Sequence, residues 1–112
     1  MLSWSSNAIG EQADLAGLAA GTGDAGIDHG ASLLRFATAC AGEDDAELAA
    51  ARAALVDDTD EAFMVDAAAV AANFEMMTRL ADGTGARMPG DVLERRAATI
   101  GVMGVADLTS RR

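Results

Sequence analysis

The first residues to test for chemistry are the single histidine and the single cysteine of the chain, His29 and Cys40. Both fall on one expected helix, where a rise of 1.5 Å per residue separates them by ~16 Å. Because this distance exceeds hydrogen-bond reach, the imidazole cannot activate the thiol within one subunit. A free cysteine is usually buried, so the sequence favours a small buried apolar role for Cys40. His29 is expected to be a solvated or capping side chain.

The number and spacing of possible ligands argue against redox, metal and phosphate sites. One cysteine allows no intramolecular disulfide, no Cys-x-x-Cys pair and no thiolate zinc site within one chain. The acidic run 57–61 and the segment 82–85 lack the ligand spacing of an EF-hand loop. The glycines of GTGDAG follow an expected helix and precede no Gly-Lys-Ser/Thr, so they are linker glycines. We therefore expect no metal and no cofactor.

Asp66 is the most informative carboxylate, because it interrupts the otherwise apolar stretch 62–72. A carboxylate in an apolar environment is costly unless it is paired or exposed. One interpretation is an interhelical ion pair between Asp66 and Arg35 or Arg52. The other interpretation is a polar group that lines a cavity.

The elements that must position these residues are helices. Hydrophobic residues make up 51% of the 112 positions, and most of the excess is alanine, which is the best helix former. No run alternates apolar and polar residues as a strand does, and glycine clusters divide the chain. The sequence predicts a single all-α domain of about five helices over residues 1–112.

Capping residues, glycines and the apolar period set the expected helix boundaries. The expected helices run from residue 6 or 7 to 20, 28–41, 43–55, 59–81 and 92–100. The fourth is apolar nearly all round in its first half, so we expect it to be buried on most sides and central. Asp91 and Glu94 form an aspartate version of the capping box at the last helix. The tail 101–112 is expected to fray or to dock on a neighbouring subunit.

The charge of the chain excludes several classes of partner. Eighteen acidic residues against eight basic ones give a formal net charge of −10. Such a surface repels phosphate backbones and anionic lipids, so we expect neither nucleic acid nor a membrane as partner. No apolar stretch reaches the ~18 residues of a membrane span, and no signal-peptide pattern opens the chain. We expect a cytoplasmic protein.

Residues 66–85, DAAAVAANFEMMTRLADGTG, resemble the C-terminal helix of the carboxymuconolactone decarboxylase/AhpD-like (alkylhydroperoxidase D-like) family. In that family a helix ending in a sequence like N-x-x-x-x-x-R-x-A-D-x-x-G closes the domain. The segment LLRFA at 33–37 is similar to the next helix upstream, and the resemblance covers most of 4–85. It implies an all-helical domain that assembles into dimers, trimers or hexamers.

Family members with peroxidase activity carry Cys-x-x-Cys-x-x-x-His at the start of a helix, where a thiolate reduces peroxide and closes a disulfide. Placing Trp4 on the aromatic position before the second cysteine puts Leu2 and Ser5 on the cysteines. Ile9 then stands on the histidine. The resemblance therefore implies a short form that lacks the dithiol site, and no catalytic residue is assigned.

Three hypotheses for function follow. The first is a degenerate, noncatalytic homo-oligomeric or interaction domain, since a core with so few large side chains favours obligate association. The second is an enzyme of the same family acting on a small molecule. It would be either a thiol-independent decarboxylase-type activity in a pocket near Trp4, Asp66, Asn73 and Arg79, or an alkylhydroperoxidase-type activity at Cys40. The third is an interaction module whose partner supplies a missing N-terminal half.

Overall fold

The computed structural model describes residues 14–20 and 26–105, and within these ranges all regular structure is helical. The all-α class is confirmed for the described part of the chain, which holds six helices and no strand. In order they are α2 (Leu15–Ala19), α3 (Gly30–Ala41), α4 (Asp45–Asp58), α5 (Glu61–Thr84), α6 (Gly90–Arg95) and α7 (Ala97–Val102). None of these helices combines the length and apolar content needed to span a membrane.

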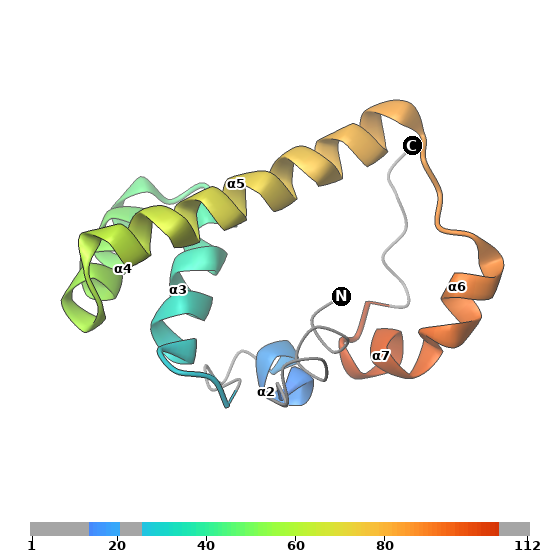
Figure 1. The fold of residues 1–112 in the computed structure, drawn as a ribbon, viewed down its shortest axis with the longest axis horizontal. Coiled ribbons are helices and arrows are strands. Elements are labelled where there is room, and N and C mark those ends of the chain that lie inside the picture. Colours follow the sequence, from blue (N-terminus) through green and yellow to red (C-terminus); the bar gives the residue numbers. More distant parts are fainter. Residues whose placement is uncertain (1–13, 21–25, 106–112) are drawn as a thin grey trace.

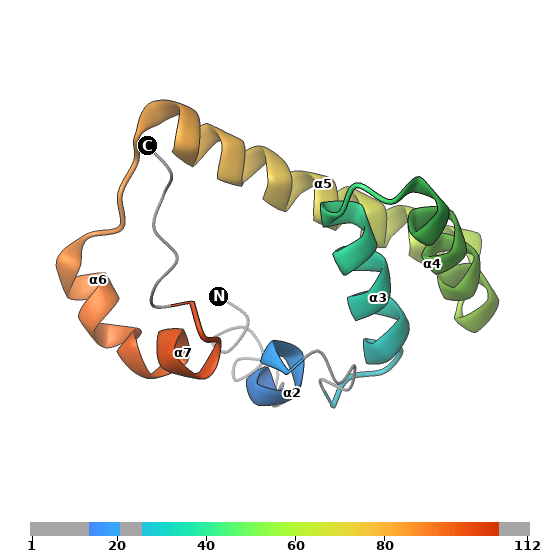
Figure 2. The ribbon, with the colours of Figure 1, turned by 180° about the vertical axis from the view of Figure 1, so that it is seen from behind.

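The helices follow one another around a ring rather than packing into a closed bundle (Figures 1 and 2). The long helix α5 is one side of the ring, and α3 and α4 pack against its N-terminal end. From its other end the chain passes through α6 to α7, which contacts α2. The radius of gyration is 15.3 Å. A compact domain of about this length has ~13 Å, so much of the surface of α5 is left uncovered.

The hydrophobic core lies where α3, α4 and α5 meet. Its buried members are Phe36 and Ala39 of α3 and Ala51 and Leu55 of α4. Leu55 has no exposed surface and is the largest fully buried side chain among the described residues. Partly buried side chains surround this cluster: Leu33, Leu48, Met64, Ala67 and Ala68. Four of these nine core residues are alanine, which brings backbones close but supplies little volume.

Aspartate side chains begin three of the helices. Asp44 Oδ1 accepts hydrogen bonds from two amides of the first turn of α4, at 2.9 and 3.0 Å. Asp60 Oδ1 accepts one from the Phe63 amide at 2.8 Å, and Asp14 caps α2 in the same way. At the other end of α5, Gly85 adopts a left-handed φ of 68°, which glycine reaches without a Cβ clash. The acidic run 57–61 therefore contains a helix cap.

The end of the chain differs from the prediction of one helix over 92–100. A break at Arg96 (φ −104°, ψ 6°) separates α6 from α7. The capping box is wrong too, because α6 begins at Gly90 and Asp91 already lies in its first turn. There Asp91 Oδ2 accepts a bond from Arg95 at 2.9 Å. Of the expected tail, Gly101 and Val102 continue α7, and residues 106–112 lie outside the described ranges.

The burial predicted for α5 is wrong. None of its 24 residues is buried, and every residue from 72 to 91 is exposed. The physical reason is that α3 and α4 cover one side of the first half of α5 (Figure 2). The periodic apolar residues of α5 therefore meet solvent in a single copy of the chain.

Candidate functional site

The residues expected in a pocket do not share one in the described structure. Trp4, and Leu2, Ser5 and Ile9 at the family's redox positions, lie outside the described residues. Asp66, Asn73 and Arg79 are exposed on α5. From the first to the last of these three, the helix rises ~20 Å. Arg79 Nη2 pairs with Glu75 Oε1 on its own helix at 2.8 Å.

Neither interpretation of Asp66 describes its place in the structure. Arg35 makes a bidentate contact with Glu47, at 2.8 and 3.1 Å, and among the described residues no ion pair joins Asp66 to Arg35 or Arg52. Asp66 faces solvent on α5 and lines neither the hollow between α2, α3 and α4 nor the one between α4 and the start of α5. Its carboxylate is hydrated in the single chain and needs no partner there.

Cys40 is exposed, so the prediction of a buried side chain is wrong. Helix α3 turns Phe36 and Ala39 toward α4, which leaves Cys40 just outside the buried face. His29 stands at the opposite end of α3, as the helix spacing requires. The structure therefore brings no base to the thiol among the described residues.

The described residues do assemble one polar cluster, formed by His29, Ser32, Asp58 and Phe63. His29 Nδ1 lies 3.1 Å from Asp58 Oδ2, and the Ser32 hydroxyl donates to the same carboxylate oxygen. The His29 ring meets the Phe63 ring edge-on at a centroid distance of 5.7 Å. His29 takes a left-handed φ of 58°, uncommon outside glycine, at the start of α3. The cluster thus joins the start of α3 to the end of α4 and the start of α5.

This cluster does not have the order of a serine–histidine–aspartate triad. In such a triad the imidazole lies between the hydroxyl and the carboxylate and takes the hydroxyl proton. Here Asp58 lies in the middle, and both Ser32 and His29 bind its Oδ2 atom. With the imidazole directed to the carboxylate, Ser32 is not activated as a nucleophile. The arrangement is a polar clamp between helices.

The clamp predicts a pH-dependent effect of Asp58→Asn. The hydrogen bond from Ser32, and then that from His29, hold the pKa of Asp58 below its ordinary value. A carboxyl whose pKa falls on folding stabilises the fold above ~3.9 and loses that effect as the pH drops through its lowered pKa. Asp58→Asn should therefore lower the thermal midpoint by a few degrees near neutral pH, and the difference should shrink toward about pH 3. Thermal circular dichroism across this range measures it.

Asp57→Asn is the matched control, because the neighbouring carboxylate is exposed near the same end of α4. Both variants remove a negative charge from a helix C-terminus, where the helix dipole disfavours it. Only Asp58→Asn removes the carboxylate of the clamp. Equal melting changes in the two variants, or a difference that does not vary with pH, would contradict this assignment.

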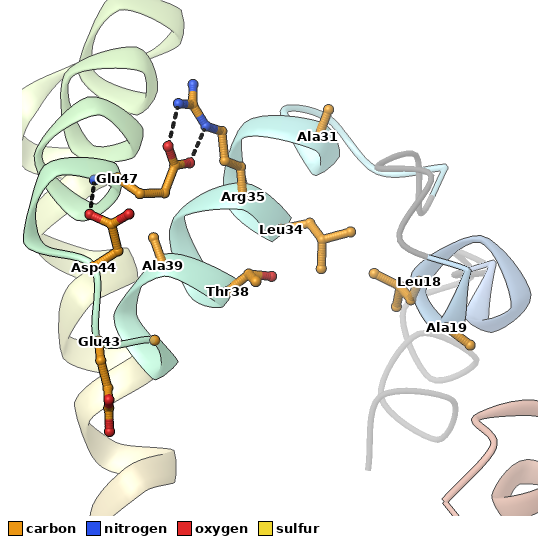
Figure 3. Close-up of a pocket in the computed structure, with 11 residues that line it drawn as sticks. Leu18, Ala19, Ala31, Leu34, Arg35, Thr38, Ala39, Glu43, Asp44 and Glu47 are labelled. Carbon is orange, nitrogen blue, oxygen red and sulfur yellow. Dashed lines mark hydrogen bonds and ion pairs between the residues drawn. The ribbon is translucent and has the colours of Figure 1, made fainter.

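A hollow of about 510 Å³ lies between α2, α3 and the start of α4 (Figure 3). Leu18 and Leu34 point toward one another across it, and the Arg35–Glu47 ion pair forms part of its wall. The hydrogen bond between these two raises the pKa of Arg35 and lowers that of Glu47. The lining holds no histidine and no cysteine. The hollow therefore offers a satisfied ion pair and no nucleophile–base pair.

The most extensive unusual surface is the exposed apolar surface of α5, which we call the α5 face. Phe74 is 51% exposed and Leu80 63%. Seven large apolar side chains make up the α5 face: Phe63, Val65, Val70, Phe74, Met76, Met77 and Leu80. In sequence, the helical period of Phe63, Ala67, Val70, Phe74, Met77 and Leu80 indicated a buried side of the helix, but it did not identify which molecule covers that side.

The geometry thus defines an all-helical protein with an uncovered apolar helix and no assembled catalytic group among the described residues. No protein-family model, no curated protein and no solved structure matches this chain. The resemblance of 33–37 and 66–85 to the AhpD-like family stays a prediction.

Proposed function

We propose that this protein is a noncatalytic homo-oligomeric domain, a degenerate AhpD-like protein whose copies associate through the α5 face. The observation that carries the proposal is the exposure of every residue of α5 from Ala72 onward, with large apolar side chains among them. We further propose that it works in the cytoplasm and binds copies of itself rather than nucleic acid.

The size of the α5 face supports association. Five of its seven members lie on one side of the helix and expose between 37% and 63% of their surface: Phe63, Val70, Phe74, Met77 and Leu80. Monomeric proteins rarely expose contiguous apolar patches of more than a few hundred square ångströms. Helices also draw most of their stability from packing, and the second half of α5 has little packing in a single copy. Association supplies the missing contacts.

The polar groups support the noncatalytic part of the proposal. The only cysteine cannot form an intramolecular disulfide, and the Ser32 hydroxyl and His29 imidazole both bind Asp58. The resemblance of 66–85 agrees with a family fold that has lost its redox motif. Steady consumption of alkyl hydroperoxide with a dithiol reductant, abolished in Cys40→Ala, would contradict this part.

The first prediction of the proposal concerns mass. Light scattering coupled to size-exclusion chromatography, at micromolar protein, should give at least twice the chain mass of 11.3 kDa. Circular dichroism of the same fraction serves as the control, because it shows whether the species measured is helical. A helical species that stays at 11.3 kDa as its concentration rises would overturn the proposal.

A further inference from the structure

We infer that two copies pair antiparallel along α5, about a two-fold axis near Ala72. This inference rests on the proposed association and adds the partner, the direction and the register. It starts from a subset of helix positions that we call the α5 seam. The seam alternates steps of four and three residues: Phe63, Ala67, Val70, Phe74, Met77 and Ala81. This is the spacing of positions a and d in a heptad repeat, which lie on one side of a helix.

Charges are segregated away from the α5 seam. If Ala67, Phe74 and Ala81 are the a positions, Glu61, Glu75 and Asp82 occupy b positions and Arg79 an f position. Positions b and f lie farthest from the partner in a paired helix. The salt bridge between Arg79 and Glu75 lies on this outer side. Pairing through the seam therefore buries none of these four charges.

Side-chain volumes favour the antiparallel direction. With the axis near Ala72, Phe63 faces Ala81 of the second copy, and Met77 faces Ala67 of that copy, which is partly buried against its own core and keeps some exposed surface. Val70 faces the second copy's Phe74, so each layer combines a larger side chain with a smaller one. A parallel pair would stack Phe74 on Phe74 and Ala81 on Ala81, which alternates crowded layers with voids. Close packing disfavours both.

Asp66 and Asn73 are compatible with this direction. Both occupy g positions beside the seam and are exposed. In the antiparallel pair the g positions of the two copies share one side of the interface, but the two Asp66 carboxylates are ~18 Å apart along the axis, beyond the ~8 Å screening length of physiological salt. The two Asn73 side chains come close to the axis, where their amides can bond to each other.

Thiol cross-linking tests the register. Cys40→Ala first removes the native thiol, and Ala67→Cys and Met77→Cys are then made singly and together. Positions that face each other across a seam of paired helices come within disulfide reach, whereas those ~15 Å apart do not. Under mild oxidation we expect the double variant to run as a covalent dimer on a non-reducing gel. Each single variant should run as a monomer.

Three other outcomes would overturn the inference, and they separate its failure from that of the proposed function. Efficient cross-linking of either single variant alone would show parallel pairing. A double variant that is dimeric by light scattering but does not cross-link would show another register or another surface, which overturns the inference but leaves the homo-oligomeric part of the proposed function standing. A folded double variant and a folded wild-type chain that are both monomeric would show that the proposed function itself fails.

Discussion

Phe74→Glu is expected to dissociate the oligomer. Phe74 is 51% exposed in a single copy and belongs to both the α5 face and the α5 seam. Loss of a central aromatic contact costs ~2 kcal/mol or more, and a two-fold axis introduces the change twice. The two losses together are ~4 kcal/mol of binding free energy, so the dissociation constant should rise about a thousandfold. Light scattering as a function of concentration measures the shift toward 11.3 kDa.

Ala72→Glu is the matched control for this variant. It adds the same charge two residues away, at an exposed position on the outer side of α5. The oligomer should persist in Ala72→Glu, because position f does not meet the partner. If both variants dissociate equally, the added negative charge weakens the oligomer wherever it stands on α5, and the Phe74 contact is not the cause. An oligomeric Phe74→Glu protein would exclude the α5 face as the contact.

Leu55→Ala is expected to give the largest loss of stability. Leu55 has no exposed surface and packs with Phe36, Ala39 and Ala51 at the junction of α3 and α4. Removing a buried leucine side chain loses its transfer free energy and leaves a cavity, together about 3 kcal/mol. In a domain of this length that corresponds to a fall of more than ~10 °C in the thermal midpoint. Thermal circular dichroism at fixed protein concentration measures it.

Leu93→Ala serves as the control, since Leu93 is 45% exposed on α6. Substitutions away from buried contacts usually change stability by less than ~0.5 kcal/mol. If the Leu55→Ala and Leu93→Ala proteins have the same thermal midpoint, the described core does not stabilise the fold. If both variants associate to the same extent, the core residue Leu55 contributes to the stability of the fold but not to the contact between copies.

Local signals were sufficient to predict the helical class and most helix boundaries. The expected starts at 43 and 59 lie two residues before the observed starts, where Asp44 and Asp60 are the caps, and glycine ends both α3 and α5. These signals work because a cap and the turn it closes are only two or three residues apart. The break at Arg96 was missed because neither glycine nor proline stands there, so the local sequence carries no signal for it.

Burial and the polar clamp could not be predicted in the same way. An apolar period shows that one side of a helix avoids water, but it does not identify what covers that side. This is why α5 was expected in the core of a single chain. His29 and Asp58 are 29 positions apart in sequence and meet only because α3 and α4 pack together. Cys40 was expected on the buried side of α3, but that side contains Phe36 and Ala39 and leaves Cys40 exposed.

The exposure of residues 72–91 also bears on how long a copy of the chain survives in a cell. A helix without tertiary support opens readily, and proteases cleave opened backbone in proportion to its population. The pairing proposed above would lower that population by mass action, since a partner that binds only the helical form stabilises it. A newly made copy without a partner would then be the copy most open to degradation. Turnover of this protein would fall as its own abundance rises.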